Sequence, residues 1–151
     1  MNTMSKNNLF LDSSVVVAGA ISTSGAANAL FMLAVAEKIS ITISEQVIIE
    51  SERALALKSP RSLPYYRDLL RMAKPRIVRI PAPSEVAKYL SIIADPTDAP
   101  ILAAAVKAGS DYLVTLNRKH FLTDPKVAEK SGLRIGTPGD ALAWVRQQVG
   151  K

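Results

Sequence analysis

Acidic and amide side chains lie at four places within or next to apolar segments of the chain. Asp12 and Asn117 each come directly after a short apolar run, Asp98 begins an alanine-rich segment, and Glu50 lies within a run of helical periodicity. An acid beside a buried strand is costly to remove from water unless it meets a cation or hydrogen-bond donors. Carboxylates that converge from separate segments suit Mg²⁺ or Mn²⁺, which binds phosphate and activates water for phosphodiester hydrolysis.

Glu50 is distinguished from its acidic neighbours by its place on the helical wheel. Glu50 falls at the edge of an apolar arc, whereas Glu45 and Glu52 fall on the opposite, solvated side. The residues of that arc are Val47, Ile48, Ala54, Leu55 and Leu57. A carboxylate that leans toward the core needs a partner, either a metal ion or a basic side chain in a salt bridge.

Each of the other positions also has a purely structural interpretation. Asp12 and Asp98 are good helix N-caps, and Asp95 competes with Asp98 for that role. Asn117 is a common turn residue. Single positions therefore leave the choice between structure and chemistry open.

The elements that must position these residues alternate between strands and helices. The pattern predicts strands at residues 8–12, 39–43, 76–80, 112–115 and 134–135. It predicts helices at residues 15–21, 26–38, 45–58, 63–73, 83–94, 98–108 and 138–149, with Ser44 as a cap and Gly109 ending the sixth. Such alternation predicts a three-layer α/β/α fold with a central parallel sheet, whose functional crevice lies at the carboxyl ends of the strands.

Length and composition favour one globular domain over residues 1–151. There are no cysteines, which excludes disulfides and thiolate metal sites. No secretory signal is apparent. The longest apolar stretches, 29–36 and 99–106, are far shorter than the roughly 18 residues of a membrane span. We therefore expect a cytoplasmic protein that does not enter a membrane. The net charge of +6 is compatible with a polyanionic partner and equally with solubility alone.

Four blocks, in this order and spacing, resemble the PIN-domain nucleases, the family that includes the toxins of VapBC-type toxin–antitoxin pairs. They are Leu-Asp-Ser-Ser-Val-Val-Val (11–17), Ile-Ser-Glu-Gln-Val-Ile-Ile-Glu (43–50), Asp-Ala-Pro-Ile-Leu-Ala-Ala-Ala (98–105) and Asp-Tyr-Leu-Val-Thr-Leu-Asn-Arg-Lys-His-Phe (111–121). Each block alone is weak, whereas the ordered set covers most of the chain and is fairly specific.

The resemblance implies a PIN-like fold and a Mg²⁺- or Mn²⁺-dependent endoribonuclease that leaves a 5′-phosphate and a 3′-hydroxyl. Its acidic positions carry over to Asp12, Glu50, Asp98 and Asn117, with Ser14 and Thr115 as hydroxyl groups beside them. On this basis Asp12 and Asp98 are the main metal ligands, Glu50 completes the negative charge and orients the attacking water, and Asn117 positions a metal-bound water. Without metal, the clustered carboxylates should have raised pKa values.

Asn117 departs from the aspartate often found at its position. One fewer negative charge would hold a second metal less firmly, so one-metal chemistry is favoured. The same residue keeps an alternative open, a catalytically weak or inactive PIN-fold module that binds RNA or an antitoxin.

The resemblance further implies RNA as substrate, a homodimer, and a cognate antitoxin that blocks the site with an Arg or Lys. Arg118 and Lys119 are candidate phosphate contacts. His120, the only histidine, is interpreted as a loop residue, and Trp144 as a core or dimer contact. A basic stretch is interpreted as a solvated face; it comprises Arg61, Arg67, Arg71, Lys74 and Arg76.

Two other phosphate-handling α/β folds do not fit the chain. A receiver domain needs an acidic pair after its first strand and a phosphoacceptor Asp, but Ser13 and Ser14 follow Asp12, and no Asp ends the strand at 39–43. A haloacid-dehalogenase-like phosphatase needs the motif Asp-x-Asp after its first strand, and Asp12-Ser13-Ser14 does not match that motif.

Overall fold

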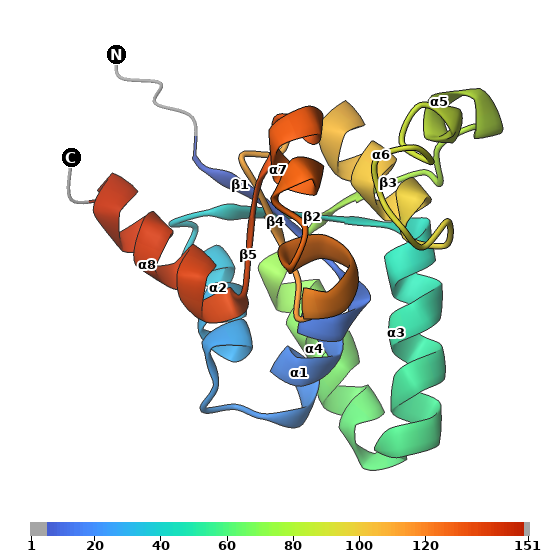
Figure 1. Cartoon of the computed structure of the whole chain (residues 1–151). Coiled ribbons are helices and arrows are strands. Elements are labelled where there is room, and N and C mark those ends of the chain that lie inside the picture. The colour runs from blue at the N-terminus through green and yellow to red at the C-terminus, as the bar shows by residue number, and fades with distance from the viewer. Residues whose placement is uncertain (1–5, 150–151) are drawn as a thin grey trace.

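The computed structural model describes residues 6–149 and contains a five-stranded parallel sheet with the strand order β3-β2-β1-β4-β5 (Figure 1). The strands are β1 (Asn8–Leu11), β2 (Ser40–Ser44), β3 (Arg76–Val78), β4 (Tyr112–Val114) and β5 (Arg134–Gly136). Every neighbouring pair is parallel. The predicted α/β class is therefore confirmed.

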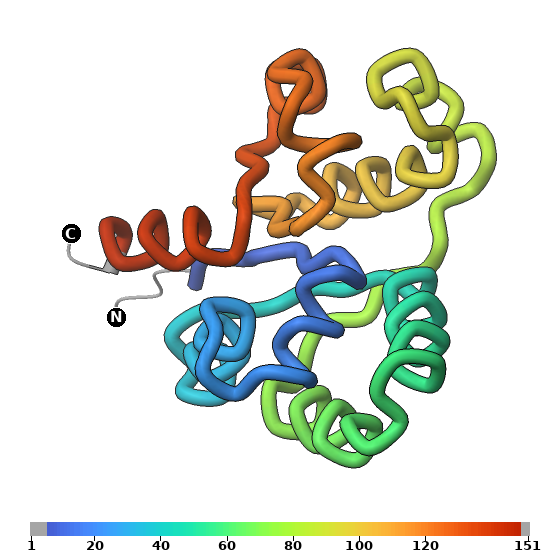
Figure 2. The backbone as a smooth tube through the Cα atoms, turned by 60° about the horizontal axis from the view of Figure 1, so that its bottom comes forward, coloured from blue at the N-terminus to red at the C-terminus, as the bar shows by residue number. Residues whose placement is uncertain are grey.

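Helices cover both faces of this sheet. They are α1 (Ser13–Ile21), α2 (Ala26–Val35), α3 (Glu45–Lys58), α4 (Leu63–Ala73), α5 (Pro83–Ala87), α6 (Ala99–Lys107), α7 (Pro125–Ser131) and α8 (Pro138–Val149), with short helical turns η1 (Pro60–Ser62) and η2 (Arg118–Leu122). Figure 2 shows α1–α4 on one side of the strands and α5–α7 on the other, while α8 lies beside α2.

The chain reverses its direction across the sheet at β1. It runs outward from β1 through β2 to β3, and then returns to place β4 on the other side of β1. Leu11 pairs with Val114, so β1 and β4 end side by side. In open parallel sheets, a crevice forms outside the strand ends at such a switch point. Asp12 and Thr115 are the residues that leave the sheet there.

The core is built on strands that are apolar on both faces, as expected for a covered parallel sheet. Leu9, Phe10 and Leu11 are fully buried in β1. Trp144 of α8 packs on Tyr112 of β4, with ring centroids 5.3 Å apart, which agrees with the interpretation of Trp144 as a core contact.

Three helical segments differ from the sequence prediction. The helix predicted at 83–94 ends at Ala87, because the chain then changes to turns with three-residue hydrogen bonds, such as Tyr89 N–H to the Val86 carbonyl. α7 and η2 were not predicted, although Asp124 and Pro125 form an ordinary N-cap and first helical residue. Leu57, placed on the buried arc of α3, is 81% exposed.

Within residues 6–149 no single helix has the length and apolar character to cross a bilayer. The α1 and α2 helices reach that length and composition only as a pair, which is bent by 91°.

Candidate active site

Asp12 lies at the carboxyl end of β1 and is the N-cap of α1, with only 6% of its surface exposed. Its Oδ1 accepts a hydrogen bond from the Ser13 backbone N–H at 2.8 Å. Its Oδ2 accepts bonds from the Ser14 hydroxyl at 3.0 Å and the Thr115 hydroxyl at 2.8 Å. Asp12 therefore caps the helix with one oxygen and binds the two hydroxyl groups with the other.

The two hydroxyl groups beside Asp12 have their own orientation fixed by the backbone. The Asn117 N–H donates to Thr115 Oγ1, and the Leu116 N–H donates to Ser14 Oγ, both at 3.0 Å. Since each oxygen already accepts an N–H, its own hydrogen is free to point at the carboxylate. Asp12 is thus held in one orientation before any ligand binds.

Burial is the main influence on the Asp12 carboxyl group and raises its pKa. The hydrogen-bond donors Thr115, Ser14 and Ser13 lower this pKa, and the nearby charge of Glu50 raises it. Among residues 6–149, no lysine or arginine forms an ion pair with Asp12. The side chain has good donors but no compensating positive charge.

Glu50 projects from α3 toward the same place and is half-buried. The Ser13 hydroxyl donates to Glu50 Oε1 at 3.1 Å, so Ser13 contacts both carboxylates. Gln46 Nε2 donates to Glu50 Oε2 at 3.1 Å and to the Thr97 carbonyl at 3.3 Å, which ties α3 to the segment before α6. The salt bridge considered for Glu50 is not found among the described residues. Gln46 was not predicted as a site residue, because nothing in its local sequence distinguishes it.

Asp98 occupies the N-cap position of α6, but its side chain makes no capping hydrogen bond, so the N-cap interpretation of this carboxylate is wrong. Asp98 Oδ2 instead lies 2.6 Å from His120 Nδ1. That oxygen is fully buried, and the imidazole is its one polar contact among the described residues. Burial raises the pKa of Asp98; the His120 contact lowers it, and the Asp95 and Asp12 charges raise it.

The raised pKa values of Asp12 and Asp98 agree in direction with the sequence expectation, but the main cause is burial rather than mutual repulsion. In the described region Asp12, Glu50 and Asp98 do not bring their ligand atoms within 4.8 Å of one another, whereas Asp95, Asp98 and His120 do. The acidic residues thus approach one another less closely than the sequence implied. Asp95 and His120 lie together at the site, although the sequence favoured a helix cap for Asp95 and a loop position for His120 over a contact with substrate phosphate.

Asn117 follows β4 and caps η2, since its Oδ1 accepts a hydrogen bond from the His120 backbone N–H at 3.2 Å. The interpretation of Asn117 as a turn residue therefore agrees with the structure. The amide nitrogen of Asn117 lies 3.1 Å from His120 Nδ1. Arg118 and Lys119 are exposed on η2 beside the crevice. The basic stretch is exposed throughout, as a solvated face should be; its members are Arg61, Arg67, Arg71, Lys74 and Arg76.

A divalent cation fits the donor set of this site. Asp12 and Asp98 offer carboxylate oxygens, one of them fully buried beside the His120 imidazole, and Glu50 adds a third carboxylate nearby. Hard oxygen donors of this kind are the ligands of Mg²⁺ and Mn²⁺.

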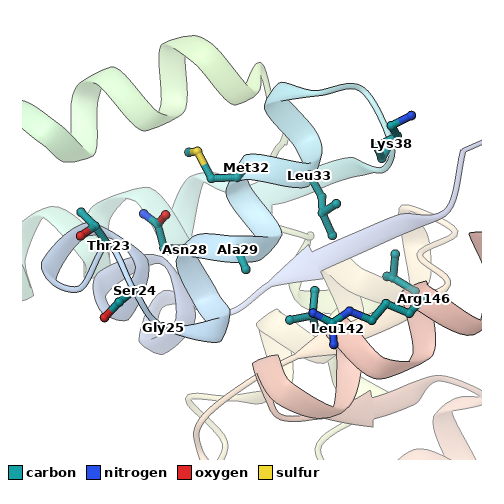
Figure 3. Close-up of a pocket in the computed structure, with 11 residues that line it drawn as sticks. Thr23, Ser24, Gly25, Asn28, Ala29, Met32, Leu33, Lys38, Leu142 and Arg146 are labelled. Atoms are coloured by element: carbon teal, nitrogen blue, oxygen red, sulfur yellow. The ribbon is translucent and has the colours of Figure 1, made fainter.

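A cavity with a volume of about 720 Å³ lies elsewhere, between α2 and α8 (Figure 3). Its walls include Met32, Leu33 and Leu142, and its charged residues are Lys38 and Arg146. None of the acidic residues lines it, so cavity size does not locate the chemistry here.

Comparison with known proteins decides the family. The model of the PIN domain matches residues 8–119, about three-quarters of the chain. The chain belongs to the PIN-domain family. No curated protein matches this PIN-domain chain.

Solved structures agree on the fold at low sequence identity. VapBC2 from Rickettsia felis, bound to a DNA fragment from its promoter, is 20% identical with a TM-score of 0.59, over 85% of this chain and 96% of that one. PAE2754 from Pyrobaculum aerophilum is 18% identical with a TM-score of 0.62, over 93% and 90%. FitAcB from Neisseria gonorrhoeae is 16% identical with a TM-score of 0.60, over 87% and 98%. The predicted PIN-like fold is confirmed.

Proposed function

We propose that this PIN-domain protein is a Mg²⁺- or Mn²⁺-dependent endoribonuclease and the toxin of a toxin–antitoxin pair. The observation that carries the proposal is the buried Asp12 carboxylate, which three donors hold in one orientation at the switch point of the sheet without a basic partner. A buried carboxylate of this kind is stabilised by a cation. Membership of the PIN family supports nuclease chemistry at that place.

Asp12 and Asp98 would hold the metal, directly or through water, with Glu50 completing the negative charge. When bound, the metal would neutralise charge on the phosphate and lower the pKa of a water molecule. Ser13 and Gln46 hold Glu50 in place by hydrogen bonds, so Glu50 is suited to orient the attacking water.

The remaining residues have supporting roles in this proposal. Ser14 and Thr115 fix Asp12, and Asn117 positions water at the site. Arg118 and Lys119, exposed beside the crevice, contact the phosphates of the RNA. The net charge of +6 favours approach of a polyanion.

The proposed partners follow from the family and the structural neighbours. Similarity to VapBC2 supports a cognate antitoxin for this chain. We further propose a homodimer that acts in the cytoplasm, where its RNA substrates are. The resemblance described above adds that the antitoxin blocks the site with an Arg or Lys, whose charge would pair with Asp12 or Asp98.

The second candidate is a PIN module that binds RNA or antitoxin without turnover. Asn117 favours it, since an amide carries no negative charge for a metal. The separation of Asp12, Glu50 and Asp98 beyond 4.8 Å also favours it, because three direct ligands of one ion lie closer together.

RNA cleavage by purified protein, with Mg²⁺, with Mn²⁺ and with chelator, separates the two functions. We expect Asp12→Asn and Asp98→Asn each to lower the cleavage rate more than about 100-fold, since even outer partners of a metal site contribute 10–100-fold. Asp68→Asn is the matched control, because Asp68 is exposed on α4 and pairs with Arg71. Equal cleavage by the parent and both site variants would indicate a contaminating nuclease and favour the non-catalytic module.

A further inference from the structure

The side chain of His120 brings its Nδ1 atom between two carboxylates at the edge of the proposed site. Nδ1 lies 2.6 Å from Asp98 Oδ2 and 3.6 Å from Asp95 Oδ2. The ligand atoms of all three residues fall within 4.8 Å of one another. The three residues come from two separate places, the turn before α6 and the η2 turn after β4.

Two tautomers of His120 fit this arrangement. Asn117 Oδ1 accepts the His120 backbone N–H, which fixes the amide with its Nδ2 at 3.1 Å from His120 Nδ1. A proton on Nδ1 is donated to Asp98 Oδ2 across the 2.6 Å contact. With the proton on Nε2 instead, the single lone pair of Nδ1 faces the carboxylate oxygens, and a cation bound there takes the place of the proton.

The two carboxylates are prepared for the same ligand. Asp95 Oδ1 accepts hydrogen bonds from the Thr97 backbone N–H at 2.9 Å and the Thr97 hydroxyl at 2.7 Å, so its Oδ2 is the oxygen left toward His120. Asp98 Oδ2 is fully buried, and His120 Nδ1 is its one polar contact among the described residues. Each carboxylate therefore turns one oxygen toward Nδ1.

We propose, resting on the proposed metal-dependent nuclease, that His120 Nδ1 is a metal ligand together with Asp95 and Asp98, and that it makes the site prefer Mn²⁺ to Mg²⁺. Neighbouring ligands of an octahedral ion with bonds of about 2.1 Å lie about 3.0 Å apart. The distances of 2.6 and 3.6 Å bracket that separation, so small side-chain movements suffice.

The preference follows from the chemistry of the donors. Mg²⁺ takes oxygen ligands almost exclusively, whereas imidazole nitrogen suits first-row transition ions. Asp98 belongs to both the proposed catalytic set and this mixed nitrogen and oxygen set. One ion bound at Asp98 would therefore be selected by His120, although the sequence identified only oxygen ligands.

Pulsed electron paramagnetic resonance of bound Mn²⁺ tests the nitrogen ligand directly. His120 is the only histidine, so in tag-free full-length protein any imidazole ¹⁴N coupling to Mn²⁺ reports on this residue. We expect the coupling in the parent and in the control Asp68→Asn, and its loss in His120→Gln. Unchanged circular dichroism would show that the variant is folded.

Competition between Mn²⁺ and Mg²⁺ gives the second readout. We expect the parent to prefer Mn²⁺ by about tenfold or more, and His120→Gln to lose most of that preference because its Mn²⁺ affinity falls while its Mg²⁺ affinity changes little. Bound Mn²⁺ without ¹⁴N coupling, equal loss of both affinities in the variant, or no Mn²⁺ binding at all would overturn the proposal.

RNA cleavage measured on the same samples keeps this inference separate from the nuclease proposal. A parent protein that shows the ¹⁴N coupling but cuts no RNA with either metal would refute the nuclease and leave the His120 ligand standing. A parent that cuts RNA but shows no coupling would refute the ligand and leave the nuclease standing.

Discussion

Replacing Thr115 by valine removes one hydroxyl group from the centre of the site while keeping the shape of the side chain. Thr115 is fully buried. Its hydroxyl donates to Asp12 Oδ2 at 2.8 Å and accepts the Asn117 backbone N–H at 3.0 Å. Thr115→Val therefore removes a donor from a buried carboxylate and leaves a backbone N–H without its partner.

The expected cost follows from those two hydrogen bonds. A hydrogen bond to a charged group contributes about 1.5–3 kcal/mol, and an unpaired polar group costs about 1–3 kcal/mol when it is buried. Since Asn117 is only half-buried and water can reach part of the site, we expect the free energy of unfolding to fall by about 2–4 kcal/mol. For a chain of this length each kcal/mol lowers Tm by about 2–4 °C.

Urea and thermal unfolding in chelator, at pH 7.5 and at pH 4, measure this cost. The Thr115 donor lowers the pKa of Asp12 by favouring the charged form, so its contribution is present when Asp12 is ionised and is lost as acid protonates the carboxylate. The deficit of Thr115→Val should thus be larger at pH 7.5. Thr115→Ser, which keeps the hydroxyl, should lose clearly less. Equal losses for Val and Ser, or a Val deficit that grows in acid, would refute the reasoning.

Substitutions at three positions give further tests of the structure. Burial raises the pKa of Asp12, so the metal-free parent loses stability as the pH rises through that pKa. Thermal unfolding in chelator should therefore show Asp12→Asn to be more stable than the parent near neutral pH, and this gain should vanish in acid. Lys74 ends α4 at φ 50°, so Lys74→Gly should add about 0.5–1 kcal/mol in urea unfolding, and Lys74→Ala should not. A Cβ on Gly136 would clash with Tyr112 Oη, so Gly136→Ala should lose about 1–3 kcal/mol of stability in the same assay.

The elements that the sequence predicted well are those with local signals. Apolar periodicity and flanking prolines predicted α4 at its observed bounds, and Ser44 caps α3 through the Val47 N–H as its residue type suggested. Strands β1 and β2 were predicted to within one residue, β1 from its continuous apolar run and β2 from its alternating β-branched residues. Turn chemistry was harder: the path from Ala87 to Asp98 depends on Pro96 and the Asp95–Thr97 bonds, which carry no periodic signal.

The same limit applies to the site. The placement of Asp12, Ser14 and Thr115 together follows from two parallel strands that end side by side, which an alternating strand and helix pattern makes foreseeable. The approach of His120 to Asp98 depends on the path of two irregular segments, η2 and the turns before α6. No local pattern predicts that approach, so sequence analysis interprets His120 only as a loop residue.

The central claim is that Asp12 and Asp98 bind one divalent cation in the same crevice. A crystal structure of the full chain grown with Mn²⁺, with anomalous scattering recorded at the manganese edge, tests it most directly. The account predicts an anomalous peak within about 2.3 Å of an Asp98 oxygen and in contact with Asp12, directly or through one water. Strong Mn²⁺ peaks that leave both carboxylates without a metal, at saturating concentration, would contradict it.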